Sequence, residues 1–295
     1  MESREHPVVE VIETREDNMN IINEVEHKKV ELMRTLVEKQ DPTSKTNHNL
    51  CTWSLSVQEA DDFMIRRFLR ARDLDVEKAS TLFLKYLKWR RTFMPKGFIP
   101  ASDIPNELSQ KKMFLQGFDK KGRPISVAFG GRHVPSKDKG GLDEFKRTLY
   151  SVQSRENMCE VINYLSVIKL YLMPNGQEKF VGIADCEGWG FSNCDIHGFV
   201  GGLHILQDCY PERLGKMFIV HAPYVFMAAW KIIYPFIDSN TKKKLTLRYH
   251  IYHVSVQIVF VENKKLKSTF LEDIDESQLP EIYGGKLPLV PLQDC

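Results

Sequence analysis

The stretch Tyr210–Asp238, YPERLGKMFIVHAPYVFMAAWKIIYPFID, decides the fold because it joins an apolar strand to an unusually apolar helix. The run KMFIVHA has the length and composition of a buried strand. The helix expected over Tyr224–Ile237 carries one charged residue, Lys231, and Pro235 breaks its last turn. It is too apolar for a water-facing surface, and a membrane span needs ~20 apolar residues. Composition alone therefore leaves open whether the helix is buried in a core or covers an apolar cavity.

The bulk properties are those of an ordinary globular protein. The 295 residues suffice for one large domain, or for a small domain and a medium one. The formal net charge of +2 indicates no nucleic-acid partner. The six cysteines form no C-x-x-C pair and the chain begins without a signal-peptide pattern, so we expect a cytoplasmic protein.

The N-terminal part of the sequence predicts helices only. Residues 1–50 are expected to form an extension with one amphipathic helix, loose up to residue 14 and helical from about Arg15 to Lys39. Its thin apolar seam is Ile22, Val25, Leu32 and Leu36. Residues 51–100 are expected to form a small all-α domain containing a helical hairpin. Its inward positions are Phe63, Ile65, Phe68 and Leu69 on the first helix, and Ala79, Leu82, Phe83, Tyr86 and Leu87 on the second.

From residue 105 to 290 the pattern changes to alternating strands and helices. Residues 113–129 read as a strand, a tight turn at Asp119 and Gly122, and a second strand. A long helix is expected in 142–167, and buried strands in KFVGIADC, KMFIVHA and IVFVEN. This alternation predicts an α/β domain with several parallel strands.

The strongest sign of an enzyme is Gly188-Trp189-Gly190 after a predicted strand. A dinucleotide fingerprint needs a third glycine, and Asn193 occupies that position. We therefore expect a strand-to-helix turn in which Asp185 caps backbone amides. The sequence has no nucleophile elbow, H-E-x-x-H or Walker loop. It predicts no enzyme, no cofactor and no metal site.

Apolar segments lie beside local basic clusters in the sequence. The clusters are Arg66, Arg67, Arg70 and Arg72, then Arg213, and then Lys242, Lys243 and Lys244. An apolar cavity with a cationic mouth suits an amphiphile with an anionic head. For the arginine series, a solvated helix face is the alternative.

Tyr210–Pro223 resembles a signature of the CRAL-TRIO lipid-transfer family, whose founding type moves phosphatidylinositol. Four further stretches agree in order: FLRAR with DLDVEKA and KWR, DKKGRP, PFIDSNTKKK, and LPEIYGG. The resemblance runs from about Asp61 to Leu287.

The resemblance implies a small N-terminal helical domain followed by an α/β lipid-binding domain. In that fold a mixed sheet is the floor of a hydrophobic pocket, and helices are its walls. The helix at Tyr224–Ile237 would be a mobile gate that covers acyl chains when closed and meets the bilayer when open. Its gate and pocket residues are Tyr224, Phe226, Met227, Trp230, Ile233, Tyr234 and Ile237.

The family's head-group residues can be carried over position by position. They correspond to Arg72, Glu212, Arg213, Thr241 and Lys244. Cations would hold the phosphate, and a hydroxyl and a carboxylate would bind inositol hydroxyls.

Two departures from the family pattern stand out. The tyrosine and hydroxyl positions that bind phosphatidylcholine in the founding type correspond to Leu115, Ser126, Phe180 and Gly182, so the choline-binding set is missing. In addition, Leu245–Gln257 follows Lys244 where the family runs almost straight into the next strand. This segment is either a real insertion or a splice or gene-model artefact that disrupts the site.

The sequence thus predicts a non-enzymatic, monomeric phospholipid-binding and transfer protein that touches membranes transiently. Its partners would be phosphatidylinositol and a second lipid or hydrophobic ligand, and no nucleic acid. The alternatives are a carrier or sensor of another small hydrophobic molecule, and a membrane-recruited adaptor that binds a partner through residues 15–39.

Overall fold

The computed structural model describes residues 7–42, 62–93, 99–136, 140–153, 177–237, 242 and 257–291. The chain divides into two compact units. The first comprises Met1–Cys51 and Leu55–Trp89, and the second comprises Thr52–Ser54 and Arg90–Cys295. Each unit is described by itself.

A helical hairpin forms the centre of the first unit. Helices α2 (Asp62–Arg70) and α3 (Val76–Phe93) are joined by a turn in which Asp73 and Leu74 have φ angles of 52° and 61°. The expected inward residues of α3 are all buried, and so are three of the four in α2. The exception is Phe63, which is 50% exposed. Phe63 lies in the first turn of α2, and the prediction that it faces inward was wrong.

Helix α1 (Pro7–Gln40) differs from its prediction in length and in its buried face. It begins at Pro7, in a region expected to be loose. Val25 and Leu32 of the predicted seam are 43% and 52% exposed. The buried positions are instead Glu26, Val30, Met33 and Val37, which recur at helical spacing. Glu26 belongs to this face because its carboxylate accepts hydrogen bonds from Arg70 Nε (3.2 Å) and Nη2 (2.9 Å) on α2.

The second unit is built on a five-stranded sheet in the order β1-β2-β3-β4-β5. The strands are β1 (Met113–Phe118), β2 (Pro124–Phe129), β3 (Phe180–Asp185), β4 (Leu214–Val220) and β5 (Gln257–Phe260). The β1–β2 pair is the expected antiparallel hairpin and the other pairs are parallel, which confirms a mixed sheet. In the hairpin turn, Asp119 Oδ1 accepts hydrogen bonds from the backbone N–H groups of Lys121 and Arg123.

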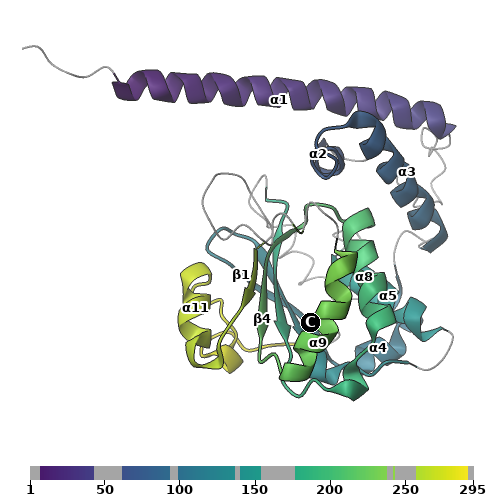
Figure 1. Ribbon diagram of the computed structural model, residues 1–295, viewed down its shortest axis with the longest axis vertical. Coiled ribbons are helices and arrows are strands. Elements are labelled where there is room, and N and C mark those ends of the chain that lie inside the picture. Colours follow the sequence, from purple (N-terminus) through teal and green to yellow (C-terminus); the bar gives the residue numbers. More distant parts are fainter. Residues whose placement is uncertain are drawn as a thin grey trace, which may run out of the picture. The chain divides into compact units, whose positions relative to one another are not determined.

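Alternating side chains give the sheet two apolar faces, which different helices cover (Figure 1). On one face Val181, Ile183 and Phe218 pack against Phe270 of α11 (Leu266–Asp273) and Tyr283. On the other, Ala184, Met217 and Ile219 lie beneath α8 (Ile196–Cys209) and α9 (Tyr224–Ile233). Both faces are therefore withdrawn from water, as parallel strands require.

Further helical elements complete the second unit. The short α4 (Pro105–Ser109) precedes the sheet, and α5 (Gly141–Gln153) packs along α8. The remainder of the long helix expected in 142–167 lies outside the described residues. Helix α9 gives way at Pro235 to the 3-10 turn η5 (Tyr234–Phe236), where the missing proline N–H is tolerated. Among the described helices, none has the length and apolar character needed to cross a bilayer.

Replacing Phe218 by alanine should test whether the α11 face is a true core. Phe218 is 0% exposed, and its ring centroid lies 4.9 Å from that of Phe270. We expect Phe218→Ala to lower the free energy of unfolding in urea by about 3–5 kcal/mol. Phe191→Ala is the matched control, since this phenylalanine is 85% exposed. A loss below about 1 kcal/mol for Phe218→Ala would contradict the assigned core.

Candidate functional site

The face of the sheet beneath α9 carries the positions expected to form a pocket floor. Leu115, Ser126, Gly182, Met217 and Ile258 are register partners in one row across the five strands. Leu115, Ser126 and Gly182 are also positions at which the expected choline-binding residues are missing. A Cβ atom at Gly182 would lie 2.7 Å from Met217 Cε, so the glycine leaves the room that the thioether fills.

The inner side of α9 closes this face with aromatic rings. Ala229 is buried against the cluster of Cys186, Trp189 and Ile219. The Phe226 ring lies edge-on to Trp189 with centroids 5.5 Å apart, and Trp230 lies edge-on to Phe260 at 5.9 Å. Among the predicted gate residues, Phe226 and Trp230 thus contact the rest of the fold through their rings.

The outer side of α9 and η5 is exposed, contrary to the expectation that this helix avoids water. The exposed residues include three predicted gate residues and two further ones: Tyr224, Met227, Tyr234, Ile232 and Phe236. Ile233 is half-buried and Ile237 is 4% exposed. The expectation failed because a single helix lying on a sheet can bury only one of its sides, and here both sides are apolar.

Glu212 and Arg213 lie side by side immediately before β4. Arg213 is only 7% exposed, and its Nη1 donates a hydrogen bond to the Glu178 carbonyl oxygen at 3.0 Å. The Glu212 carboxylate is 3.8 Å from Lys179 Nζ, and its backbone is left-handed with φ 61°. The pair therefore occupies the amino-terminal edge of the parallel strands, next to the segment that enters β3.

The other predicted head-group residues belong to the first unit or lie outside the described residues. Arg72 belongs to the first unit, where its Nη1 donates to the Ala71 carbonyl oxygen. Thr241 and Lys244 lie outside the described residues, as does the segment 245–256. Lys242 is described: its Nζ donates to the Pro235 carbonyl oxygen at 2.7 Å and lies 5.6 Å from the centre of the Tyr234 ring. Lys242 is thus linked to the end of the predicted gate.

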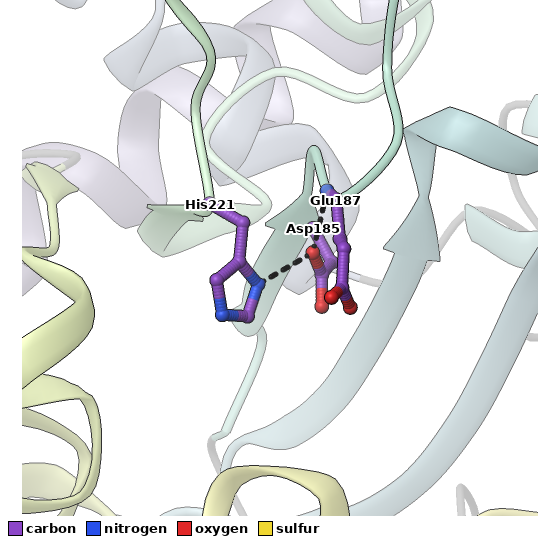
Figure 2. A group of neighbouring side chains, drawn as sticks. All are labelled: Asp185, Glu187 and His221. Carbon is purple, nitrogen blue, oxygen red and sulfur yellow. Dashed lines mark hydrogen bonds and ion pairs between the residues drawn. The ribbon is translucent and has the colours of Figure 1, made fainter.

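At the carboxyl ends of β3 and β4 stands a second polar group, Asp185 with His221 and Tyr283. Asp185 is 1% exposed, and its Oδ1 accepts from Glu187 N, which confirms the expected cap (Figure 2). His221 Nδ1 lies 2.8 Å from the same oxygen, and Tyr283 OH donates to Oδ2 at 2.7 Å. Burial raises the pKa of Tyr283, so its hydroxyl stays a donor.

Asp185, Glu187 and His221 are the one group of described residues with the spacing of metal ligands. However, both Asp185 oxygens already accept hydrogen bonds from the protein. The cluster accordingly fastens the C-terminal segment to the ends of the two central strands. No sequence pattern indicated that His221 and Tyr283 contact Asp185, although Tyr283 stands in the LPEIYGG motif.

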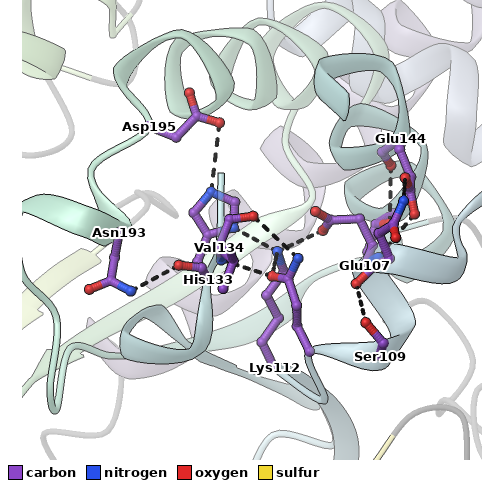
Figure 3. A network of polar contacts seen from close by, with 11 residues as sticks. Glu107, Ser109, Lys112, His133, Val134, Glu144, Asn193 and Asp195 are labelled. Atoms are coloured by element: carbon purple, nitrogen blue, oxygen red, sulfur yellow. Dashed lines mark hydrogen bonds and ion pairs between the residues drawn. The ribbon is translucent and has the colours of Figure 1, made fainter. Parts of the chain in front are cut away.

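A third polar group, the Lys112 network, is buried below α5 and α8 (Figure 3). Lys112 is 4% exposed, and its Nζ contacts Glu107 Oε2 (2.7 Å), Gln110 Oε1 (2.7 Å) and His133 Nδ1 (2.6 Å). Asp195 caps α8 by accepting from Gly198 N at 2.8 Å. No sequence pattern indicated this network, because its members come from three separate segments, residues 107–112, 133 and 195.

Burial sets the protonation of the Lys112 network. It raises the pKa of Glu107 and lowers that of Lys112, although the two groups oppose this shift in each other. Burial, followed by the positive charge of Lys112, lowers the pKa of His133 to about 4. His133 is therefore a neutral imidazole near pH 7.

Comparison with known families agrees with this architecture. The sequence model of the CRAL/TRIO domain matches residues 108–250, and that of the CRAL/TRIO N-terminal domain matches residues 29–88. Together they match more than half of the chain. The chain belongs to the CRAL/TRIO family.

Individual relatives are similar to this CRAL/TRIO protein over most of its length. Sec14 cytosolic factor of Schizosaccharomyces pombe is 29% identical over 240 residues, which cover 77% of this chain and 76% of that protein. The phosphatidylinositol/phosphatidylcholine transfer protein SFH12 of Arabidopsis thaliana is 27% identical over 241 residues, covering 77% of this chain but 40% of that protein. The crystal structure of Sfh5 matches with a TM-score of 0.51 at 14% identity over 83% of both chains, which shows the fold alone.

The Lys112 network predicts a loss of stability on acidification of this CRAL/TRIO domain. The folded pKa of His133, about 4, lies below its ordinary value of 6.5, so the unfolded chain binds more protons in that window. The contribution of the neutral His133 to the free energy of unfolding is fully present above pH 6.5 and declines as the pH falls toward 4. Urea denaturation between pH 4.5 and 7 should show a shallower pH dependence for His133→Gln than for the wild type. His197→Gln, at an exposed histidine, should keep the wild-type slope, and equal slopes for all three proteins would refute the assignment.

Proposed function

We propose that this protein binds phosphatidylinositol against the sheet face that α9 covers, and exchanges it between membranes or presents it there. The observation that carries the proposal is an apolar sheet face covered by α8 and by the short α9, whose outer side is also apolar. Two relatives, a Sec14 cytosolic factor and a phosphatidylinositol/phosphatidylcholine transfer protein, support the same ligand class. The proposed function is binding and transfer, without catalysis.

The contacts of α9 suit a cover that opens. Its inner side rests on a small set of rings and on Ala229, with no side-chain hydrogen bond at its N-cap, Pro223. Beneath it, Met217 fills the space above Gly182 with an unbranched thioether, a side chain that repacks readily. Acyl chains would therefore displace flexible and aromatic side chains and would not break strand pairing.

Arg213 and Glu212 supply the proposed head-group contacts. A guanidinium binds a phosphate with two parallel hydrogen bonds, and a carboxylate accepts from inositol hydroxyls. In the present structure Arg213 Nη1 is bound to the Glu178 carbonyl oxygen, which is a weaker partner than a phosphate. We propose that Arg72, Thr241 and Lys244 complete this head-group set.

The outer side of α9 is the proposed membrane contact of a cytoplasmic protein. Tyr224, Ile232 and Phe236 are exposed there, and Lys231 and Lys242 belong to the same segment. Apolar and aromatic side chains enter the interface of a bilayer, and lysines are attracted to anionic lipids by ~1 kcal/mol each. The contact would be transient, because the apolar patch is small.

Arg213→Gln tests the head-group assignment. Purified protein and variant would be analysed for bound lipids by mass spectrometry, and for transfer of labelled phosphatidylinositol between vesicles. We expect transfer to fall at least about tenfold, because a charge-assisted contact with the phosphate is lost. Arg147→Gln is the control and should transfer normally, because the half-buried Arg147 of α5 pairs with Asp103 and belongs to no proposed head-group contact.

The same experiment separates the alternatives. Transfer of phosphatidylinositol by Arg213→Gln at the wild-type rate would contradict the head-group role. A different hydrophobic ligand, bound equally by wild type and variant, would instead favour the carrier alternative. Phosphatidylcholine, measured in parallel, should be transferred less than phosphatidylinositol because the choline-binding positions carry Leu115, Ser126, Phe180 and Gly182.

The membrane contact is tested by the triple variant Tyr224→Ser, Ile232→Ser, Phe236→Ser. We expect its sedimentation with anionic vesicles to weaken at least about tenfold, since burial of a large apolar side chain contributes ~1.5–3 kcal/mol. Phe191→Ser, Val134→Ser, Ile282→Ser is the control, because these residues are similarly exposed elsewhere. Equal loss in both triple variants would mean that α9 has no special role at the membrane.

A further inference from the structure

A small cavity of about 200 Å³ opens beside the Lys112 network, between α4, α5 and the beginning of α8. Leu142 and Phe145 of α5 give it an apolar wall. Glu107, His133 and Asp195 give it a polar one. A water molecule occupies ~30 Å³ in the liquid, so the cavity has room for more than a single water.

The cavity is separate from the proposed lipid head-group pair. His133 follows β2 and Asp195 follows β3, which places both at the carboxyl-terminal edge of the parallel strands. Glu212 and Arg213 precede β4 and therefore lie at the opposite edge. A ligand in this cavity would not compete directly for those two residues.

The polar wall holds a donor that has no hydrogen-bond partner. A lysine ammonium only donates, so His133 Nδ1 accepts from Lys112 Nζ and the ring proton is on Nε2. His133 is 3% exposed, and Nε2 makes no hydrogen bond within the described part of the chain. A buried donor of this kind is rare in folded proteins unless a water or ligand meets it.

An acceptor stands opposite that donor. Asp195 Oδ2 is 3.6 Å from His133 Nε2, which is too far for a hydrogen bond. The other oxygen, Oδ1, is occupied by the N–H of Gly198. His133 and Asp195 thus present one donor and one acceptor side by side to the same cavity.

This pair discriminates between classes of ligand. An ammonium group can donate to Asp195 but cannot accept from His133, and a carboxylate can accept from His133 but meets the Asp195 charge. A hydroxyl group accepts and donates at once. We propose that the cavity binds a small neutral polyol, with one hydroxyl bridging His133 Nε2 and Asp195 Oδ2. The Leu142 and Phe145 side chains would contact its carbon chain.

Long-range ¹H–¹⁵N NMR of the histidine rings, recorded on the full chain near pH 7, tests this proposal. Glycerol is the probe, with ethylammonium and acetate as charged probes of similar size. We expect glycerol to shift the His133 signals saturably, and the two ions to produce no saturable shift. If only water fills the cavity, no probe saturates, and the proposal fails. Tighter binding of either ion would also overturn it.

Variants locate the response in the cavity. Leu142→Trp should fill the apolar side of the cavity and abolish saturation by glycerol. Val134→Trp is the control and should bind glycerol like the wild type. Val134 is exposed, and only its backbone joins the network. Asp195→Asn keeps an oxygen to cap α8 but turns a donor toward His133, so glycerol should bind at least about tenfold more weakly. Unchanged glycerol binding in Leu142→Trp or Asp195→Asn would place the probe elsewhere and refute the site.

Discussion

The fold depends on the requirement that both faces of a largely parallel sheet be withdrawn from water. Here the two faces are covered in different ways. Against α11, Phe218, Phe270 and Tyr283 form a continuous buried core. Against α9, Ala229 alone is buried within the helix, and the Phe226 and Trp230 rings beside it are only partly buried. Burial of both faces stabilises the sheet, but on one face it depends on α9, which contacts the fold through a small set of side chains.

Buried charge restricts where the structure can change. Asp185 ties β3 to the segments that carry His221 and Tyr283, and Lys112 ties α4 to the end of β2. Removing one partner of such a buried group leaves the other without compensation, which is costly. Both groups flank the sheet at its carboxyl-terminal edge. Movement of α9 can leave these contacts intact, so the sheet can remain rigid while its cover moves.

The sequence predicted those parts of the fold that rest on local patterns. The hairpin at 113–129, the strand ending at Asp185 and the inward face of α3 follow from alternation, turn residues and helical spacing. The buried face of α1 was mispredicted because its decisive contact is an ion pair of Glu26 with Arg70, which a hydrophobic pattern does not reveal. Glu212 and Arg213 could be named from one motif. Lys112, His133 and Asp195 meet only in the folded chain, and nothing in their sequence neighbourhoods indicates it.

The exposed side of α9 shows why composition misled about its surroundings. An apolar helix in water usually implies burial on all sides, yet Tyr224 is 93% exposed and Phe236 is 48% exposed. Exposing apolar surface costs ~25 cal/mol per Å² in water, and this cost vanishes when the surface meets a bilayer. In the proposed function, α9 would be stabilised at a membrane, because its apolar outer side is unfavourable in water. The apolar residues that a stable soluble protein would replace would then be the ones that the proposed lipid exchange requires.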